Sequence, residues 1–449
     1  MIIKRALSSS ISNFYDIIIT GGGMIGSVLA CKLASNPVFR NISILLIESG
    51  PKKPWNIELT KNKDNFSNRV SSLNNNTKVL LQKINVWDII ESCSCQDVSQ
   101  IKVWGPGSNN ISTTFDVEDN FNLDHLAYIV ENDVLIAAVM TALNNYDNVH
   151  VLHDNIVTEY KISKNTEETV KLRLKNEEHI ECNLLIGTDG INSKVRQAMD
   201  VQYLSWNYNQ KAVVATLKIE RLKDNNTAWQ KFLHSGPIAL LPLADEISSL
   251  VWTTTPDYAK MLLSLSEESF VDALNTALWK EPIKDVFASS VTNIVSAVLK
   301  TLNIHEKHEE IIPPTITQVL KNTRAAFPVG FGHAVSYVIP HVALVGDAAH
   351  RVHPLAGQGV NLGFGDVECL DSILSKYFLI GVKLGDIRAL REYETIRQRC
   401  NVPKLIAIDF IQKIAGNSWS PLLATTNAGF QVTDAVSLLK KFFIDRAAT

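Results

Sequence analysis

An aspartate followed by a glycine-rich loop forms the stretch of this sequence with the clearest chemical meaning. Asp347 follows the apolar run 342–345, which predicts a buried strand, so we expect its carboxylate to point outward from the end of that strand. Further along, Gly357 and Gly359 allow the backbone to approach a bound molecule closely. From Val360 the apolar spacing becomes helical, which predicts free backbone N–H groups and a positive dipole end at the loop. This arrangement suits a ligand that carries hydroxyl groups and an electron-rich heterocycle.

A second ligand-binding pattern lies near the start of the chain. A short apolar run over 15–20 precedes three glycines in the spacing G-x-G-x-x-G, namely Gly21, Gly23 and Gly26. In this motif the first glycine makes a tight turn, the second lets a pyrophosphate approach, and the third packs helix against strand. A further strand over 42–47 ends in Glu48, which is placed to accept hydrogen bonds from a ribose hydroxyl. The combination predicts a site for FAD or NAD rather than NADP, with a merely glycine-rich turn as the alternative.

Two further residues belong to the same prediction. The strand over 184–187 is followed by Asp189 and by the start of a helix, so a second acid stands at a strand end. Two such strand ends in one sheet favour a shared ligand crevice over two unrelated turns. Arg69 follows a polar stretch and is a candidate to neutralise a phosphate or to cover the face of a flavin, with an ordinary surface arginine as the alternative.

Length and composition limit the class of protein. With 449 residues and 46% hydrophobic content, the chain can bury a large core and should divide into two or three domains. The formal net charge of -3 and the absence of a basic block argue against a nucleic-acid partner. The six cysteines are scattered, which suits free thiols in a reducing compartment. No apolar run approaches the roughly 18 residues that span a bilayer, so we expect a soluble or peripherally attached protein.

The first residues are typical of a mitochondrial transit peptide. Residues 1–15 contain Lys4, Arg5 and several serines but no acid. The alternative is a short frayed terminus. We expect the targeting segment to cover residues 1–14.

The middle and end of the chain differ from the ligand-binding segments. Short strands are expected at 101–104, 111–115 and 127–130, and alternating patterns at 212–219, 238–243 and 248–254 predict an antiparallel sheet. Four aromatic residues either line a pocket for a ring or belong to the core of this sheet: Trp206, Tyr208, Trp229 and Trp252. A capping box at Ser264 predicts a helix to Leu278, and Phe327-Pro328 is expected to end a strand. Two helical segments, 386–413 and 432–443, end the chain, and Pro403 is expected to interrupt the first.

The predicted fold class is therefore α/β. A Rossmann-type FAD-binding domain is expected to comprise residues 15–98, 131–200 and 322–378. An antiparallel β-sheet substrate domain, formed by 99–130 and 201–321, is inserted into it. A C-terminal helical segment over 379–449 completes the chain.

Three motifs carry a family resemblance that covers almost the whole chain from Tyr15. The glycine fingerprint, the Thr188-Asp189-Gly190 turn and the Asp347 loop occur in the order and spacing of the class A flavoprotein aromatic hydroxylases, which have the para-hydroxybenzoate hydroxylase fold. Within that family, four segments resemble the eukaryotic mitochondrial ubiquinone-biosynthesis monooxygenases: 128–133, 205–216, 235–243 and 346–365.

The resemblance implies an activity, a cofactor and partners. It implies an FAD-dependent monooxygenase that takes one oxygen atom from O2 through a flavin hydroperoxide and hydroxylates a polyprenylated 4-hydroxybenzoate at ring carbon 5, with carbon 1 of a later intermediate as a second possible target. It also implies electrons from a ferredoxin and its reductase, a complex with other ubiquinone-biosynthesis proteins, and peripheral attachment to the matrix side of the mitochondrial inner membrane. The alternatives are a hydroxylase of a small soluble phenol, a prenyl-chain reductase, and a catalytically silent FAD-bound scaffold subunit.

The resemblance also implies roles for individual residues. Gly21, Gly23 and Gly26 would face the FAD pyrophosphate, Glu48 the adenosine ribose, Arg69 the flavin, Asp189 the pyrophosphate and Asp347 the ribityl chain, while Pro354, Gly357, Gly359 and Asn361 would lie against the isoalloxazine ring. Many relatives carry an arginine at 131–133, where this chain has none, and Asn132 is the candidate replacement. The chemistry belongs to the flavin, so no catalytic triad and no metal is expected. His350 and His353 have a metal-like spacing without a third ligand and are expected to pack or to form hydrogen bonds.

Overall fold

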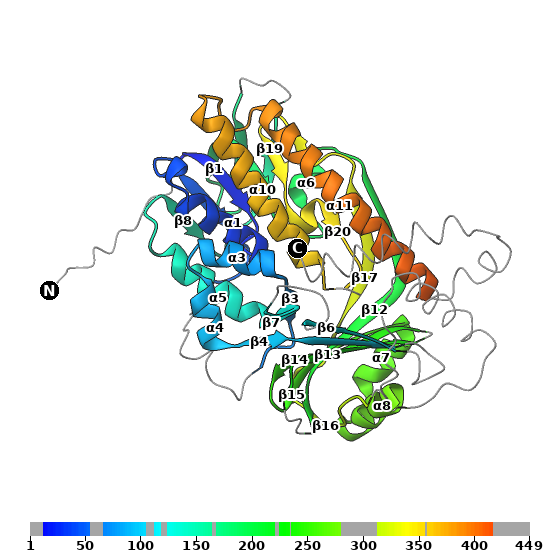
Figure 1. The fold of residues 1–449 in the computed structure, drawn as a ribbon. Helices are drawn as coiled ribbons and strands as arrows, with labels where there is room; N and C mark the ends of the chain where they lie inside the picture. The colour runs from blue at the N-terminus through cyan, green and yellow to red at the C-terminus, as the bar shows by residue number, and fades with distance from the viewer. Residues whose placement is uncertain are drawn as a thin grey trace.

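The computed structural model describes residues 12–53, 66–104, 112–117, 124–163, 168–220, 224–233, 235–279, 312–354 and 357–415. Most of the predicted targeting segment and the whole predicted helix at 432–443 lie outside these ranges. Three sheets and a set of long helices make up the described part of the chain (Figure 1).

The first sheet has the strand order of a dinucleotide-binding fold. It has eight strands: β18 (Val338–Ile339), β19 (Val342–Leu344), β11 (His179–Gly187), β1 (Phe14–Thr20), β2 (Ile44–Ile47) and β8 (Val149–Leu152) in spatial order, with β10 (Val170–Leu174) beside β11 and β9 (Val157–Lys161) beside β10. The five strands from β19 to β8 pair in parallel. The chain moves outward from β1 to β2 and β8 and then returns to the other side of β1, so β1 and β11 flank a topological switch point. The Rossmann-type prediction is confirmed.

Apolar strands explain why this sheet is buried. Ile17, Ile18 and Ile19 of β1 are inaccessible to solvent, as expected of parallel strands that are covered on both faces. The covering helices include α1 (Met24–Ser35), α5 (Asn132–Leu143), α10 (Gly359–Leu379) and α11 (Ile387–Ala415). α1 packs against both α5 and α10, and α10 packs against α11 (Figure 1).

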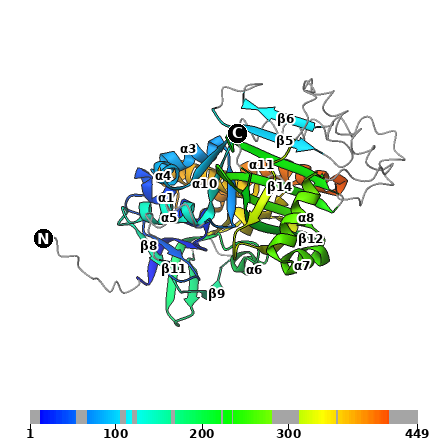
Figure 2. The ribbon, with the colours of Figure 1, turned by 90° about the horizontal axis from the view of Figure 1, so that it is seen from below.

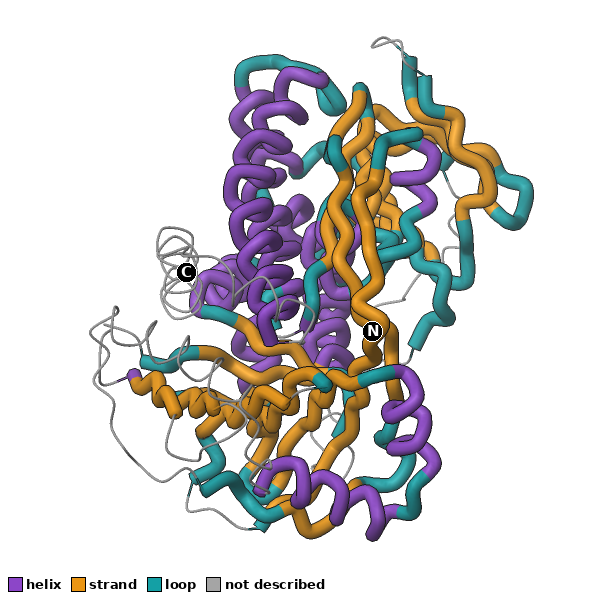
Figure 3. The backbone as a smooth tube through the Cα atoms, turned by 90° about the vertical axis from the view of Figure 1, so that its right-hand side faces the viewer, coloured by secondary structure: helices purple, strands orange, loops and turns teal. Residues whose placement is uncertain are grey.

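The second sheet is the inserted one. Its spatial order is β20 (His350–Arg351), β17 (Ala325–Ala334), β12 (Tyr203–Ile219), β15 (Ile247–Thr254), β14 (Gly236–Ala244), β13 (Thr227–Leu233), β5 (Gln100–Trp104) and β6 (Ser112–Asp116), with β16 (Ile316–Val319) also beside β12. All its pairs are antiparallel except β13 with β5. In Figure 3 its strands run across the lower part of the molecule, and Figure 2 shows β5 and β6 at one edge. The prediction of an inserted antiparallel sheet is confirmed, apart from the parallel β13–β5 pair.

A third, three-stranded sheet joins the two larger ones. It consists of β3 (Val70–Leu73), β7 (Ala127–Glu131) and β4 (Cys95–Val98), next to α3 (Asn75–Lys83) and α4 (Trp87–Cys93). We expected the strand at 127–130 in the inserted sheet, but it pairs with β3 and β4. The reason is that β7 is buried on both faces: Tyr128 packs in the core of the parallel sheet, and Ile129 packs with Leu243 of the inserted one.

Two predictions about proline were wrong. Phe327-Pro328 does not end a strand, because β17 continues through it and Pro328 pairs with Lys211 of β12. Along the described part of β20, the pairing reaches only Gly332 and His333, so Pro328 lies on open edge where no N–H donor is needed. Pro403 lies inside the continuous α11, and its exposed position lets water bond the carbonyl group that proline leaves without a partner.

The predicted capping residue, Ser264, does not cap the helix that was expected to follow it. Ser264 ends an additional helix, α7 (Pro256–Ser264), which the sequence pattern did not predict. The helix that follows is α8 (Glu267–Trp279), and its cap is Ser266, whose Oγ accepts the N–H of Ser269 at 3.1 Å.

Candidate functional site

Four parallel strands bring the predicted site residues to one edge of the sheet. Ile47 of β2 pairs with Thr20 of β1, Thr20 with Gly187 of β11, and Gly187 with Leu344 of β19. The residues that follow these strand ends are therefore neighbours: Glu48, Gly21, Thr188 with Asp189, and Gly346 with Asp347. These strand ends form the carboxyl edge of the sheet, which is where the sequence predicts a shared ligand crevice.

The three fingerprint glycines meet different surroundings. Gly21 has a φ of +103°, and a Cβ there would lie 2.5 Å from the carbonyl oxygen of Thr188. A Cβ on Gly26 would lie 1.9 Å from the carbonyl oxygen of Gly21. A Cβ on Gly23, in contrast, would meet no atom within 4 Å. The fold itself therefore requires Gly21 and Gly26, whereas Gly23 faces open space at the N-terminus of α1, where no side chain caps the helix.

Thr188 joins two of the strand ends, a role that the sequence pattern did not reveal. Its Oγ1 donates toward the carbonyl groups of Thr20 and Gly21, at 2.9 and 2.8 Å. This holds the Asp189 turn against the glycine fingerprint. The threonine stands inside the predicted motif, so its position between strand and acid was the available signal.

Glu48 is held by backbone amides. Its carboxylate accepts the N–H of Gly22 at 2.7 Å and the N–H of Gly50 at 2.6 Å. Each carboxylate oxygen has a second lone pair, so the side chain can still accept from a ligand hydroxyl group. The half-buried Glu48 is thus oriented before any ligand arrives.

The two carboxylate oxygens of Asp189 differ: one accepts backbone hydrogen bonds, and the other accepts none among the described residues. Its Oδ2 accepts the backbone N–H groups of Lys194 at 2.6 Å and Val195 at 3.2 Å, at the start of α6 (Lys194–Ala198). Its Oδ1 is buried and has no hydrogen-bond partner among the described residues. A buried acceptor without a partner is costly, which marks Oδ1 as a candidate for a ligand or water contact.

A buried arginine that we did not predict connects the Asp189 loop to the Asp347 turn. The guanidinium group of Arg196 donates to Ile191 from Nη2 and to Ala348 from Nη1, both at 2.7 Å. The same side chain lies over the ring of Tyr203 at 3.8 Å. Arginine can do this because its planar group has several donors in fixed directions.

Asp347 lies in the short 3₁₀ turn η3 (Gly346–Ala348), and its side chain is exposed, as expected. Burial nevertheless raises the pKa of its carboxyl group, while His350 and Arg351 act to lower it. A side chain that water can reach, although protein surrounds it closely enough to raise its pKa, is recessed rather than protruding. No hydrogen-bond partner of the Asp347 carboxylate is present among the described residues, so it is available to a ligand.

Asp366 is the buried counterpart of Asp347, and sequence analysis did not select it. It accepts hydrogen bonds from the N–H of Gly346 at 2.9 Å, from Nε2 of His350 at 2.6 Å and from Nε of Arg397 at 2.7 Å. Burial acts to raise the pKa of Asp366, but His350 and Arg397 outweigh it and hold that pKa below its ordinary range. His350 therefore serves as a hydrogen-bonding residue, as predicted.

The side chain of Asn361 connects the helix after the glycine loop to the β3–α3 segment. Gly357 has a φ of +60°, and its N–H donates to the carbonyl group of Pro354 at 3.1 Å. Asn361 is buried; its Nδ2 donates to Ser72 at 2.8 Å, and its Oδ1 accepts from Thr77 Oγ1 at 2.9 Å. The Asn361 side chain is thus committed to the β3–α3 segment, and contact with a ligand is left to its backbone.

The start of α10 completes this edge of the site. The N-cap residue Gln358 provides no side-chain cap, so the first amide groups of the helix, including that of Gly359, lack this protection. Ile25 from the glycine fingerprint packs directly against this helix, because a Cβ on Gly363 would lie 2.6 Å from its Cδ1. The two predicted ligand-binding motifs are therefore in contact.

Arg69 and Asn132 lie next to each other. The carbonyl group of Arg69 accepts the N–H of Asn132 at 3.0 Å, and Oδ1 of Asn132 accepts from Ser71 Oγ at 2.7 Å. The Arg69 side chain is exposed. Both residues lie at the end of the β3–β7 pair, next to Val70 and Glu131.

The four aromatic residues divide into two pairs. Trp229 and Trp252 belong to the core of the inserted sheet. Trp206 is 40% exposed and stacks on Phe331 at 3.9 Å, while Tyr208 packs edge-on against His353 at 5.4 Å. Trp206 and Tyr208 lie outside that core, and both donate to Oδ1 of Asp409 on α11, from Nε1 at 3.0 Å and from Oη at 2.7 Å.

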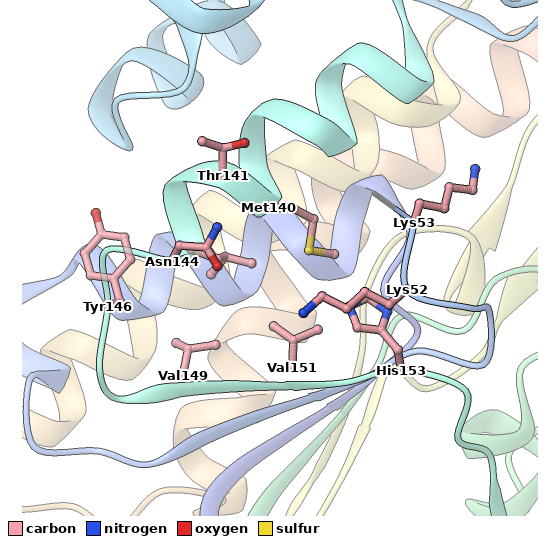
Figure 4. A pocket seen from close by; sticks show the side chains of 10 residues that line it. Lys52, Lys53, Met140, Thr141, Asn144, Tyr146, Val149, Val151 and His153 are labelled. Carbon is pink, nitrogen blue, oxygen red and sulfur yellow. The ribbon is translucent and has the colours of Figure 1, made fainter. Parts of the chain in front are cut away.

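A pocket of about 540 Å³ lies elsewhere, between α5 and the edge strand β8 (Figure 4). Met140 from α5 and Val149 and Val151 from β8 line it on opposite sides, and Lys52 extends between them. None of the predicted cofactor residues lines this pocket. It is a feature separate from the strand-end site.

Comparison with known proteins now identifies the family. The mitochondrial ubiquinone biosynthesis monooxygenases COQ6 of Rattus norvegicus and Homo sapiens are 42% and 41% identical to this chain, cover 98% of it, and are themselves covered over 92% and 93% of their lengths. The chain belongs to this family. An FAD binding domain model matches residues 296–400, which include Asp347, the glycine loop and Asp366. The enzyme is therefore an FAD-dependent monooxygenase.

Solved structures show the same fold. PqsL of Pseudomonas aeruginosa, in complex with 2-aminobenzoylacetate, superimposes with a TM-score of 0.67 at 18% identity, over 95% of this chain and 100% of that one. The p-nitrophenol 4-monooxygenase PnpA of Pseudomonas putida gives 0.60 at 14% identity, over 97% and 98%. The monooxygenase of this chain is mitochondrial, like the relatives named above. Within the described residues, no helix has the length and apolar character needed to cross a membrane.

Proposed function

We propose that this monooxygenase hydroxylates a polyprenylated 4-hydroxybenzoate at ring carbon 5 in ubiquinone biosynthesis, with FAD held along the four strand ends. The observation that carries the proposal is the alignment of Glu48, Gly21, Asp189 and Asp347 along one sheet edge at a topological switch point. Hydroxylation at carbon 1 of a later intermediate is the second candidate.

The adenosine diphosphate half of FAD fits the first two strand ends. Glu48 is held by two amides and can accept from the ribose, and the uncapped start of α1 offers N–H groups to a pyrophosphate. The open space at Gly23 allows that close approach. Gly21 and Gly26 shape the turn, and Oδ1 of Asp189 offers a further acceptor.

The flavin half of FAD fits the strand end before Asp347 and the glycine loop that follows it. Asp347 is recessed, accessible and without a hydrogen-bond partner among the described residues, as a ligand of ribityl hydroxyl groups should be. Pro354, Gly357, Gly359 and the backbone of Asn361 would lie against the isoalloxazine ring, and the α10 dipole would stabilise negative charge there. Bound FAD supplies the redox chemistry that activates O2.

The remaining residues would confine the reaction. Arg69, exposed at the β3–β7 side, would lie beside the flavin, with Asn132 in place of the arginine found in many relatives. Trp206, Phe331 and Tyr208 would form the wall against which the phenol ring binds. Such a wall orients a ring and excludes water, and both effects favour transfer of oxygen to the ring over its loss to solvent.

The partners are part of the same proposal. A polyprenylated substrate is membrane-soluble, so we infer peripheral attachment to the matrix side of the mitochondrial inner membrane and a complex with other ubiquinone-biosynthesis proteins. We infer a ferredoxin and its reductase as the electron donors. The alternatives, a soluble-phenol hydroxylase, a prenyl-chain reductase or a silent scaffold, are less favoured because the whole chain is similar to monooxygenases named for ubiquinone biosynthesis.

The cofactor assignment is tested with Asp347→Ala. We expect the purified variant to fold and to lose bound FAD, measured from the flavin absorbance per protein. Asp272→Ala, an exposed aspartate on α8, is the matched control and should keep wild-type stoichiometry. Wild-type flavin content in Asp347→Ala would show that the assignment is wrong.

The pathway assignment is tested in cells that lack this protein. Mass spectrometry should find an intermediate that misses one ring hydroxyl group, and its structure identifies the carbon. An unchanged quinone pool would refute the proposal. Purified protein whose bound flavin is never reduced and reoxidised productively would support the scaffold alternative instead.

A further inference from the structure

One buried carboxylate, that of Asp366, accepts hydrogen bonds from residues on both sides of Asp347 in the chain. Gly346 precedes Asp347 and donates its N–H to Oδ2 of Asp366 at 2.9 Å, and His350 follows and donates from Nε2 to the same oxygen at 2.6 Å. Asp366 lies on α10 and is inaccessible to solvent. The direction in which Asp347 points therefore depends on where Asp366 is held.

Two residues of α11 hold Asp366, and neither of them is a predicted FAD residue. Arg397 donates from Nε to Oδ1 of Asp366 at 2.7 Å, and Asn401, one turn later, donates from Nδ2 to the same oxygen at 3.1 Å. Both oxygens of the carboxylate thus accept two hydrogen bonds each. The Arg397 side chain is 11% exposed, so the pair is largely shielded from water.

The same guanidinium group also reaches the start of α10. Nη2 of Arg397 donates to the carbonyl group of Leu362 at 3.2 Å and to Oδ1 of Asn401 at 2.8 Å. A Cβ on Gly365 would lie 2.8 Å from Nη2, so the guanidinium group sits tightly against the helix. One side chain therefore contacts both the support of the Asp347 turn and the helix that follows the glycine loop.

A buried ion pair of this kind is a weak source of stability. The desolvation of two charges offsets most of their attraction, and apolar replacements of such pairs are often neutral or stabilising. What the pair does supply is direction, because the planar guanidinium group and the carboxylate bond in few geometries. This favours a positioning role over a purely structural one.

We propose that Arg397 is a positioning residue for FAD, acting through Asp366 on the turn of Asp347 and directly on the first turn of α10. The proposal rests on the proposed role of Asp347 as the ligand of the ribityl chain. It adds that a residue of α11, outside both ligand-binding motifs, sets the spacing between that acid and the helix N-terminus at the flavin.

A double-mutant cycle on FAD affinity tests this. Arg397→Met and Arg397→Lys are combined with Asp347→Ala, and the Kd of the apoprotein for FAD is measured by quenching of flavin fluorescence. We expect Arg397→Met to weaken binding about tenfold, as for loss of one well-placed hydrogen bond, and Arg397→Lys to weaken it less. In the Asp347→Ala background, Arg397→Met should weaken binding less than it does in the wild-type background, because the part of its effect that passes through Asp347 is already lost.

Two comparators separate positioning from general destabilisation. Tyr393→Phe removes a buried bond of the same helix, the 2.8 Å contact of Tyr393 Oη with the carbonyl of Leu344, and should lower Tm without changing Kd more than about twofold. Arg399→Met changes an exposed arginine of α11 and should change neither.

The pH dependence of FAD retention gives a second readout. The titratable and charged groups that face Asp366 are His350, Arg397, Tyr337, Tyr393, Cys369 and Asp347. Ionised Asp366 supports the turn above its ordinary pKa, and the support is lost as the pH falls through its lowered pKa. Without Arg397 that pKa rises, so Arg397→Met should release FAD at a higher pH than wild type, and Tyr393→Phe should not.

Several results would overturn the proposal. They are equal effects of Arg397→Met and Tyr393→Phe on Kd, additive effects of Arg397→Met and Asp347→Ala, or an unshifted pH of FAD release in Arg397→Met. If Arg397→Met does not fold, Arg397→Lys and Asp366→Asn carry the same comparisons. If Asp347→Ala alone leaves FAD affinity unchanged, the proposed role of Asp347 is wrong and the positioning role of Arg397 is wrong with it. If Asp347→Ala weakens FAD binding and the effect of Arg397→Met is additive with it, only the positioning role is wrong.

Discussion

Asp347 and Asp366 show how environment separates two residues of the same type. Asp347 is exposed in a recess and has no protein donor among the described residues, whereas Asp366 accepts four hydrogen bonds in the core. Burial raises the pKa of Asp347, while the neighbours of Asp366 hold its pKa low. The first is suited to a ligand and the second to holding the protein together around it.

The fingerprint glycines allow a prediction that separates folding from binding. Gly23→Ala should fold like wild type, because its Cβ meets no atom within 4 Å, but it should bind FAD at least about tenfold more weakly if the pyrophosphate occupies that space. FAD titration of the apoprotein and a melting curve measure the two effects.

Gly26→Ala is the matched control for that prediction. Its Cβ would lie 1.9 Å from the Gly21 carbonyl oxygen, so this variant should lose stability even without FAD. Wild-type FAD affinity in Gly23→Ala would place the pyrophosphate elsewhere.

At the scale of elements, the long helices α10 and α11 support the loops that follow the strand ends. α10 begins at the glycine loop, packs on α1 and carries Asp366, and α11 supports it with Arg397. Local pattern predicted where α10 starts. It did not predict that α11 would remain one helix through Pro403, because the packing of α11 along α10 outweighs the missing hydrogen bond.

The cost of that proline can be measured. Pro403 is exposed, so Pro403→Ala removes no buried contact and restores the N–H donor toward Arg399. We expect the free energy of unfolding to rise by about 1–3 kcal/mol, the range for relief of a helix-interior proline. Urea unfolding measures it. A loss of stability would mean that Pro403 itself is needed for α11 to fit against α10.

At the scale of the whole molecule, the buried His353, which precedes the glycine loop, links stability to pH. Burial, with a smaller effect of Arg351, lowers the pKa of His353 from 6.5 to about 3. The unfolded chain therefore binds a proton between these two pH values that the folded chain does not bind. The stabilising effect is complete above the ordinary pKa and is lost as the pH falls toward the lowered one.

The corresponding variant is His353→Gln, which cannot bind the proton in either state. The slope of unfolding free energy against pH, measured by urea unfolding between about pH 5 and 7, should decrease by about one proton relative to wild type. His179→Gln, at an exposed position on β11, should leave the slope unchanged. An unchanged slope in His353→Gln would mean that His353 takes up a proton in the folded protein.

The sequence by itself determined the local elements and the class of ligand. Strand, glycine turn and helix are encoded over a few residues, so the fingerprint, the two acids at strand ends and the glycine loop were visible without the fold. The tertiary structure decided which side chains remain available: Glu48 and Asp189 are partly used by backbone amides, and the Asn361 side chain is bonded to the β3–α3 segment. It also placed Trp252 in the core of the inserted sheet and left Trp206 exposed. It alone revealed Arg196, Asp366 and Arg397, because their partners are distant in sequence and no local spacing records which distant residues a buried charge will meet.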